Sequence, residues 1–124
     1  MQKPTRQQIE TASDEQLAEW SAIYLKEWRF NILKAQMSEA WKKDLWYLDK
    51  NDNPIIRYLD WNPAQNIAQA FELLIDFTLW AINRLSDKRI KCLISIGRWK
   101  VVSSVDWEIS RAITKAALLA VIGG

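Results

Sequence analysis

The sequence contains no histidine, and this absence excludes several kinds of active site. Histidine is the commonest general base and metal ligand, because its imidazole titrates near neutral pH. A Ser-His-Asp triad, a Cys-His pair and any zinc site that needs histidine are therefore excluded. Cys92 is the single cysteine, so neither an internal disulfide nor a thiolate metal cluster can form. A lone cysteine without a disulfide framework is typical of the reducing cytosol.

Glycine is also scarce, and two of the three glycines are the last two residues, so no glycine-rich phosphate loop exists. Glu72 and Asp76 stand four residues apart but have no third ligand at helical spacing. Residues 49–53 lack the ligand spacing and the closing glutamate of a calcium loop. We therefore predict no catalytic residue, no metal, no cofactor and no enzymatic activity.

Long hydrophobic runs are missing as well. The most apolar segment, residues 68–82, is interrupted by Gln69, Glu72, Asp76 and Thr78, and it is too short to cross a bilayer. Residues 1–16 are polar and have no apolar core of a signal peptide. These observations predict a cytoplasmic protein that does not contact membranes.

What is present indicates a globular protein. The 124 residues are 49% hydrophobic and 26% charged, which is ordinary for one soluble domain. We expect a single domain over residues 1–124, in which residues 1–12 are flexible, residues 13–43 form an N-terminal helical segment, and residues 44–122 form the core.

Two helices are predicted before the last quarter of the chain. Ser13 is a suitable N-cap, and the apolar residues that follow it recur on one helical face. They predict one helix from Asp14 to about Lys43, or two helices broken near Asn31; the apolar series is Leu17, Trp20, Tyr24, Trp28, Phe30, Leu33, Met37 and Trp41. Asn62-Pro63 predicts the start of a second helix, which ends near Leu85. This second helix is apolar on most of its circumference, so we expect it to be central.

Two β-hairpins are predicted. Residues 45–48 and 54–59 flank a cluster of turn-forming residues, and Pro54, which cannot donate a ladder hydrogen bond, starts the second strand. In Ile90–Ile96 apolar and other residues alternate, and Gly97-Arg98 fits a two-residue turn. That turn pairs Ile94 with Val101 and Cys92 with Ser103.

An alanine-rich helix over residues 107–122 follows the second hairpin, with Ser104 or Asp106 as its cap and a packing face of Ile109, Ile113, Ala116, Ala117 and Ala120. The predicted order is α-ββ-α-ββ-α. The predicted fold class is α+β, with an antiparallel sheet from two β-hairpins packed with helices.

Charge is spread unevenly along the chain. Residues 1–83 have a net charge of −3, whereas residues 84–124 have a net charge of +5. The bases of the second part gather around the second hairpin: Arg84, Lys88, Arg89, Lys91, Arg98 and Lys100. This predicts either a surface for anions or a hairpin edge whose charges prevent aggregation.

The eight tryptophans divide into two groups. Those on apolar faces of predicted elements are expected in the core: Trp20, Trp28, Trp80 and Trp99. Those near element ends could form a surface for a partner or for self-association: Trp41, Trp46, Trp61 and Trp107. Tyr47, Arg57 and Tyr58 would flank the same surface.

Several segments resemble a known family. They are Trp46-Tyr47 with Asp52 and Pro54, Asn62-Pro63, Ala70-Phe71-Glu72, Trp99-Lys100-Val101, and the run from Ala112 to Val121. Residues 46–121 thereby resemble the phage ABA-sandwich family, small proteins of phages and prophages. Its last segment tends to read Ala-Ile-Cys-Arg-Ala-Ala-Leu-Leu-Ala-Val, and this chain has Thr114 and Lys115 in place of Cys-Arg. Residues 30–43 are an insertion relative to the family. The resemblance implies an α+β sandwich, a phage origin and no enzymatic activity.

The predicted function is that of a phage accessory protein that binds a host protein in the host cytoplasm, for example as an inhibitor of an antiviral defence system such as CRISPR. The alternative is binding of nucleic acid or a nucleotide by the basic second hairpin, with Trp99 available for stacking. Self-association is a further prediction. The candidate partner-binding residues are Trp46, Tyr47, Arg57, Tyr58, Trp61, Arg84, Lys88, Arg89, Arg98 and Lys100.

Overall fold

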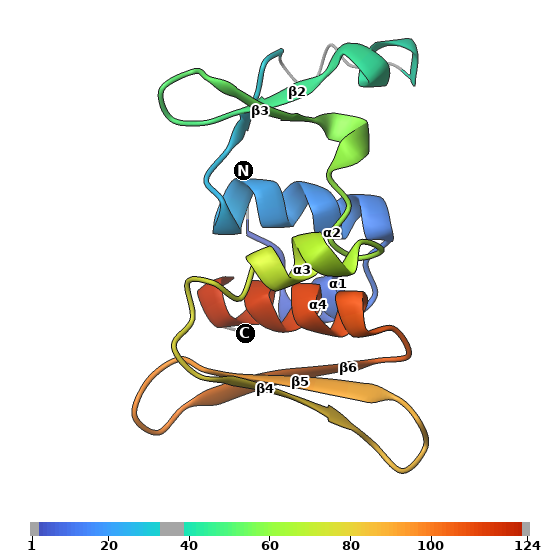
Figure 1. Ribbon diagram of the computed structural model, residues 1–124, viewed down its shortest axis with the longest axis vertical. Coiled ribbons are helices and arrows are strands. Elements are labelled where there is room, and N and C mark those ends of the chain that lie inside the picture. The colour runs from blue at the N-terminus through green and yellow to red at the C-terminus, as the bar shows by residue number, and fades with distance from the viewer. Residues whose placement is uncertain (1–2, 33–38, 123–124) are drawn as a thin grey trace.

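The computed structural model describes residues 3–32 and 39–122. Two three-stranded antiparallel sheets lie at opposite ends of the molecule, and the α-helices lie between them (Figure 1). The α+β class, with sheets packed against helices, is confirmed. Each predicted hairpin is present, but each gains a third strand and belongs to a sheet of its own.

The helix α4 (Ile109–Ile122) is the centre of the core. Every residue from Ala112 to Leu119 is buried, so the packing surface runs around almost the whole helix and is not limited to one face. Its alanines let neighbouring elements approach closely, and α4 contacts α1 (Arg6–Glu10), α2 (Asp14–Trp20) and the C-terminal sheet. The central helix is thus α4.

The predicted helix over residues 63–85 is wrong. Asn62-Pro63 begins a turn, and the helix α3 (Ile67–Glu72) starts later, with the Asn66 side chain accepting a hydrogen bond from the Gln69 N–H. Trp80–Arg84 form the strand β4, which pairs with the second hairpin. Residues 63–85 would be apolar on every side of a single helix because they join a helix and a strand, whose apolar residues repeat with different periods. After Thr78, strand pairing outweighs helix propensity.

The long N-terminal helix is also wrong, although Ser13 is confirmed as its N-cap. The helix α2 passes into a π-helical turn, Ser21–Leu25, and the chain leaves the helix at Glu27, which has a φ of 59°, to enter β1. The predicted positions Leu33 and Met37 lie outside the described residues. Within the segment predicted to be flexible, Thr5 caps α1 with a capping box and Ile9 is buried in the core.

The N-terminal sheet has the strand order β1-β2-β3, and its strands are β1 (Arg29–Phe30), β2 (Trp46–Leu48) and β3 (Pro54–Arg57). The first predicted hairpin is confirmed as β2 and β3. Pro54 is confirmed at the start of its strand, and the Asp49 carboxylate closes the turn by accepting hydrogen bonds from the N–H groups of Asn51 and Asn53.

The second hairpin exists, but its predicted register is wrong by one residue. The strands β5 (Ile90–Ser95) and β6 (Val101–Asp106) pair Ile94 with Val102 and Cys92 with Ser104. The Ile96 N–H donates to the Lys100 carbonyl at 3.0 Å, so the turn holds three residues. Because side chains alternate between faces, the slip turns Val102 and Ser104 toward α4 and leaves Val101 on the other side.

Candidate functional site

The C-terminal sheet, β4-β5-β6, has one face against α4 and one face that no described element covers (Figure 1). Cys92, Ile94 and Val102 point toward α4 and are at most 4% exposed. By alternation and pairing, the opposite side chains form what we name the outer sheet face: Leu79, Ala81, Asn83, Lys91, Leu93, Ser95, Val101, Ser103 and Val105.

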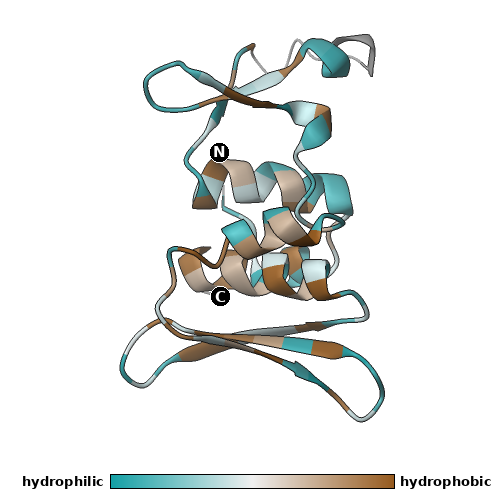
Figure 2. Ribbon diagram, viewed as in Figure 1, coloured by the Kyte–Doolittle hydropathy of each residue, from teal (hydrophilic) through white to brown (hydrophobic). Residues whose placement is uncertain are grey.

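One end of the outer sheet face is a shallow apolar hollow. Its volume is about 230 Å³, and it is lined by Leu79, Trp80, Ala81, Leu93, Ser95 and Val101. Leu79 is 65% exposed and Val101 is 58% exposed. Hydrophobic stretches in these strands are visible in Figure 2. The hollow therefore presents an apolar surface that no described element covers.

The basic residues do not form one patch. Arg84, Lys88 and Arg89 lie at the β4–β5 turn, whereas Arg98 and Lys100 lie at the β5–β6 turn. The six-residue strand β5 separates the two turns by roughly 20 Å. Arg89 is also engaged locally, because its Nε lies 2.6 Å from Asp87 Oδ2. Hydrogen bonds from Arg89, the backbone N–H first, lower the pKa of the Asp87 carboxyl.

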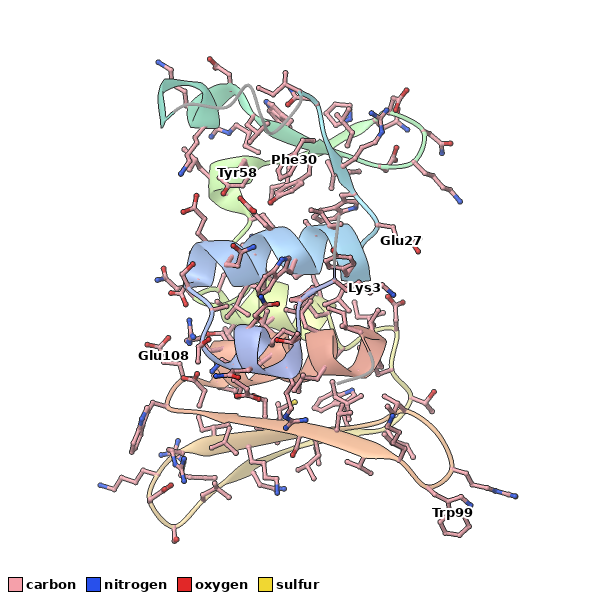
Figure 3. The ribbon with its side chains drawn as sticks, turned by 180° about the vertical axis from the view of Figure 1, so that it is seen from behind. Lys3, Glu27, Phe30, Tyr58, Trp99 and Glu108 are labelled. Carbon is pink, nitrogen blue, oxygen red and sulfur yellow. The ribbon has the colours of Figure 1, made fainter. Side chains whose placement is uncertain are left out.

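Two tryptophans expected in the core are exposed. Trp99 occupies the tip of the β5–β6 turn, is 92% exposed and extends away from the molecule (Figure 3). Trp80, at the start of β4, is 44% exposed. The physical reason for Trp99 is the longer turn, which removes it from the strand ladder. Trp107, expected near an element end, is 67% exposed.

The candidates on the first hairpin are mostly buried. Tyr47, Tyr58 and Trp61 are at most 5% exposed, so the structure corrects their assignment to a contact surface. Their rings pack in the aromatic layer between the N-terminal sheet and α2. Trp46 is half-buried, and the exposed Arg57 pairs through its Nε with Asp60 Oδ2 at 3.0 Å.

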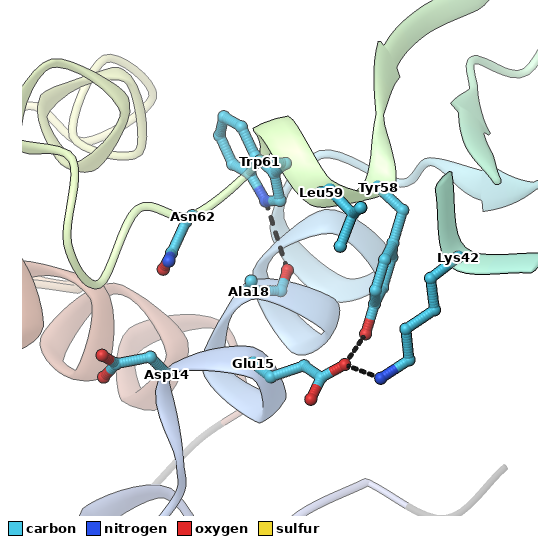
Figure 4. Close-up of a pocket in the computed structure, with 8 residues that line it drawn as sticks. All are labelled: Asp14, Glu15, Ala18, Lys42, Tyr58, Leu59, Trp61 and Asn62. Atoms are coloured by element: carbon cyan, nitrogen blue, oxygen red, sulfur yellow. Dashed lines mark hydrogen bonds and ion pairs between the residues drawn. The ribbon is translucent and has the colours of Figure 1, made fainter. Parts of the chain in front are cut away.

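A polar pocket of about 380 Å³ lies where this hairpin meets α2 (Figure 4). Lys42 Nζ and the Tyr58 hydroxyl each lie 2.7 Å from Glu15 Oε1. The same hydroxyl is 2.7 Å from Glu19 Oε1. Trp61 Nε1–H donates to the Ala18 carbonyl at 3.2 Å. No local sequence pattern brings these residues together, although Glu15 and Glu19 stand at i, i+4 on one helix face.

The chemistry of this pocket favours a structural joint. Burial first, and then the hydrogen bonds to Glu15 and Glu19, raise the pKa of Tyr58 far above its ordinary value. The phenol therefore stays protonated and donates its one hydrogen to one carboxylate at a time. Since these polar groups bind each other across two elements, they fasten the end of β3 to α2.

The remaining titratable candidate is Cys92. Burial raises the pKa of its thiol to about 11, so the nucleophilic thiolate is scarce at neutral pH. In the described part of the chain, no group of three or more acidic, cysteine or histidine side chains could hold a metal ion. None of the described helices has the length and apolar character needed to cross a membrane.

Comparison with family models, with curated proteins and with solved structures finds no match to this chain.

Proposed function

We propose that the protein is a non-enzymatic phage accessory protein that binds a host protein through the outer sheet face. The observation that carries the proposal is the uncovered hollow around Leu79, Leu93 and Val101. A contiguous exposed apolar surface with a polar surround is typical of a protein interaction site. Binding alone can block a host protein, so no catalytic group is required.

The charges of the outer sheet face and of its two turns favour an acidic partner. Lys91 is the charged residue on the outer sheet face, and the turns at both ends carry bases such as Lys88 and Arg98. A partner that inserts an apolar side chain into the hollow and presents carboxylates to Lys91 and to the two turns would complement this surface. A strongly basic partner would be repelled.

The biological setting of the proposal comes from residues 46–121, which resemble the phage ABA-sandwich family. The proposed target is a protein of a host antiviral defence complex in the host cytoplasm, with a CRISPR effector as the specific candidate. Occupying the surface by which such a complex binds its own partner would inhibit it.

The test compares two substitutions at exposed apolar residues, one on each sheet. Val101→Asp places a carboxylate in the hollow, whereas Ile55→Asp is its matched control, because Ile55 is 44% exposed on the N-terminal sheet. Tagged protein captures its partner from host lysate, and the identified acidic partner is purified for titration. We expect Val101→Asp to weaken binding at least tenfold and Ile55→Asp to leave it unchanged.

The same pair of variants tests the biological part of the proposal. Wild type and Ile55→Asp should restore the plating of a phage that the defence system restricts, and Val101→Asp should not. Binding that survives Val101→Asp would overturn the proposed surface.

Nucleic-acid binding is the other candidate function, and one observation favours it: the exposed Trp99 stands between Arg98 and Lys100 at a turn tip. Stacking on Trp99 would give affinity for single strands that falls steeply with salt. If such binding is found, is lost in Trp99→Ala, and no protein partner is recovered, the protein-binding proposal is rejected.

A further inference from the structure

The C-terminal sheet has an open edge at β4. The Ser95 N–H donates to the Leu79 carbonyl at 3.0 Å, and the Leu85 N–H donates to the Arg89 carbonyl at 2.8 Å. In an antiparallel ladder the bonded residues alternate, so the odd-numbered residues of this strand bond to β5. The N–H and C=O groups of Trp80, Ile82 and Arg84 therefore point away from the sheet. Within residues 3–32 and 39–122, no other element bonds to this edge.

The opposite edge of the same sheet is closed differently. By the same alternation, the backbone groups of Val101, Ser103 and Val105 face outward from β6. Arg6 Nη2, on α1, donates to the Ser103 carbonyl at 3.1 Å. The sheet thus has one edge that α1 protects and one edge with no such protection and no proline or lysine within the strand.

Exposed apolar side chains gather beside the open edge. Ile67 and Phe71 stand four residues apart on α3 and are 48% and 37% exposed, and Ile75 after the helix is 75% exposed. The rings of Phe71 and Trp80 lie 5.9 Å apart, which joins this stripe to the start of β4. Such a combination is suited to burial against another chain.

The charges on either side of β4 indicate that the chain that covers this edge is a second copy of the protein. Glu72 and Asp76 precede the strand, whereas Lys88 and Arg89 follow it. When two copies of β4 pair in antiparallel fashion, the acidic end of one lies next to the basic end of the other. The same arrangement, centred on Ile82, places Trp80 opposite Arg84 of the second copy, where a guanidinium can lie over an indole ring.

From these observations we infer that two copies of this chain associate through the open edge of β4. The two strands run antiparallel about a two-fold axis at Ile82, and the two sheets join into one sheet of six strands. The three outward-facing residues of each strand exchange backbone hydrogen bonds with those of the other copy. The α3 stripes are buried across the same axis, and the outer sheet faces of both copies stay accessible.

The first experiment is sedimentation equilibrium of the full chain and of two proline variants. Ile82→Pro removes an N–H that faces the open edge and leaves the β4–β5 hydrogen bonds in place. Val105→Pro is the matched control, because it removes an outward N–H at the β6 edge. We expect a wild-type dimer that Ile82→Pro weakens at least tenfold and Val105→Pro does not weaken, with circular dichroism confirming that both variants fold.

Exchanging two charges gives an independent test of the dimer if the proline variant does not fold. Lys88→Glu and Asp76→Lys should each weaken the dimer several-fold, and the double variant should restore it. The inference is overturned if the wild-type chain is still monomeric at a concentration of about 100 micromolar. It is also overturned by a dimer that survives Ile82→Pro, or by single charge variants that leave the dimer unchanged.

Discussion

The two sheets of this protein share a topology but use their faces in opposite ways. Both are antiparallel with three strands in sequence order. The N-terminal sheet has strands of two to four residues and turns its aromatic rings inward. The C-terminal sheet has strands of five or six residues, packs aliphatic side chains on α4 and leaves its other face open.

This difference shows that aromatic composition by itself does not locate an interface. Phe30, Tyr47 and Tyr58 pack with ring centroids 5.1–6.0 Å apart and bury the aromatic surface inside the molecule. In the C-terminal sheet, Trp99 stands outside the ladder in water. The available surface depends on strand register and on which helix covers the sheet, more than on residue type.

The largest effect is expected at the joint between α4 and the C-terminal sheet. Asp106 Oδ2 lies 2.7 Å from Lys115 Nζ and 3.1 Å from Arg111 Nε, and the Lys115 side chain is only 5% exposed. Asp106→Asn removes the nearer carboxylate of the buried Lys115 ammonium and leaves the Glu10 carboxylate, whose Oε2 lies 4.0 Å from Lys115 Nζ. We expect a loss of about 3 kcal/mol in the free energy of unfolding, measured by urea denaturation. Asp87→Asn, at an exposed ion pair, is the control and should leave the midpoint unchanged.

The ion pairs of Asp106 should also affect how the free energy of unfolding depends on pH. Burial acts to raise the pKa of Asp106, but hydrogen bonds from Lys115, the Glu108 N–H and Arg111 outweigh it and lower the pKa. A lowered folded-state pKa stabilises the protein above the unfolded value of about 4, and this contribution is lost as pH falls through the folded-state pKa. Asp106→Asn should therefore flatten the acid loss of stability below about pH 4; an unchanged profile would contradict this role.

A smaller effect is expected at the joint of the N-terminal sheet. Tyr58→Phe removes the hydroxyl that binds Glu15 and Glu19, and we expect a loss of about 2 kcal/mol. Amide hydrogen exchange should rise in β2 and β3 and stay unchanged in β5. Tyr47→Phe is the matched control: the buried Tyr47 hydroxyl has no partner among the described residues, so its removal should be neutral or slightly stabilising.

The smallest effect is expected at the exposed tip of the C-terminal sheet. Trp99 is 92% exposed, so Trp99→Ala should change the free energy of unfolding by less than about 0.5 kcal/mol. Thermal melts of the two proteins should superimpose, while the loss of one solvent-exposed emitter shifts the mean tryptophan fluorescence to the blue. A destabilisation above 1 kcal/mol would mean that the indole packs on the sheet.

Parts of this fold could be predicted from local rules. The first hairpin follows from a turn cluster and from Pro54, and the alternation of Ile90, Cys92 and Ile94 correctly predicts a half-buried strand. The register of the second hairpin does not follow from Gly97-Arg98, because the same sequence is compatible with a turn of two residues and with a turn of three. Only packing of Val102 against α4 decides between them.

The outer sheet face could not be predicted for the same reason. It needs Val101 turned outward, which depends on the register, and it needs β4, which continues the apolar segment that predicted a helix from Asn62-Pro63 to Leu85. The polar pocket around Tyr58 joins Glu15 and Lys42 across long stretches of chain, and no local pattern carries that information. The sequence likewise does not predict that the basic residues near the second hairpin divide between its two ends.

The position of α4 at the centre of the core has a consequence for the order of folding. α4 follows every element that it packs against, and contacts such as Arg6 with Ser103 and Arg111 with Ala12 close loops of nearly the full chain. Loops of this size make folding slow. During synthesis, the contacts of α1 and α2 with α4 cannot form until α4 has left the ribosome. The nascent chain therefore depends on α4 to escape aggregation and proteolysis.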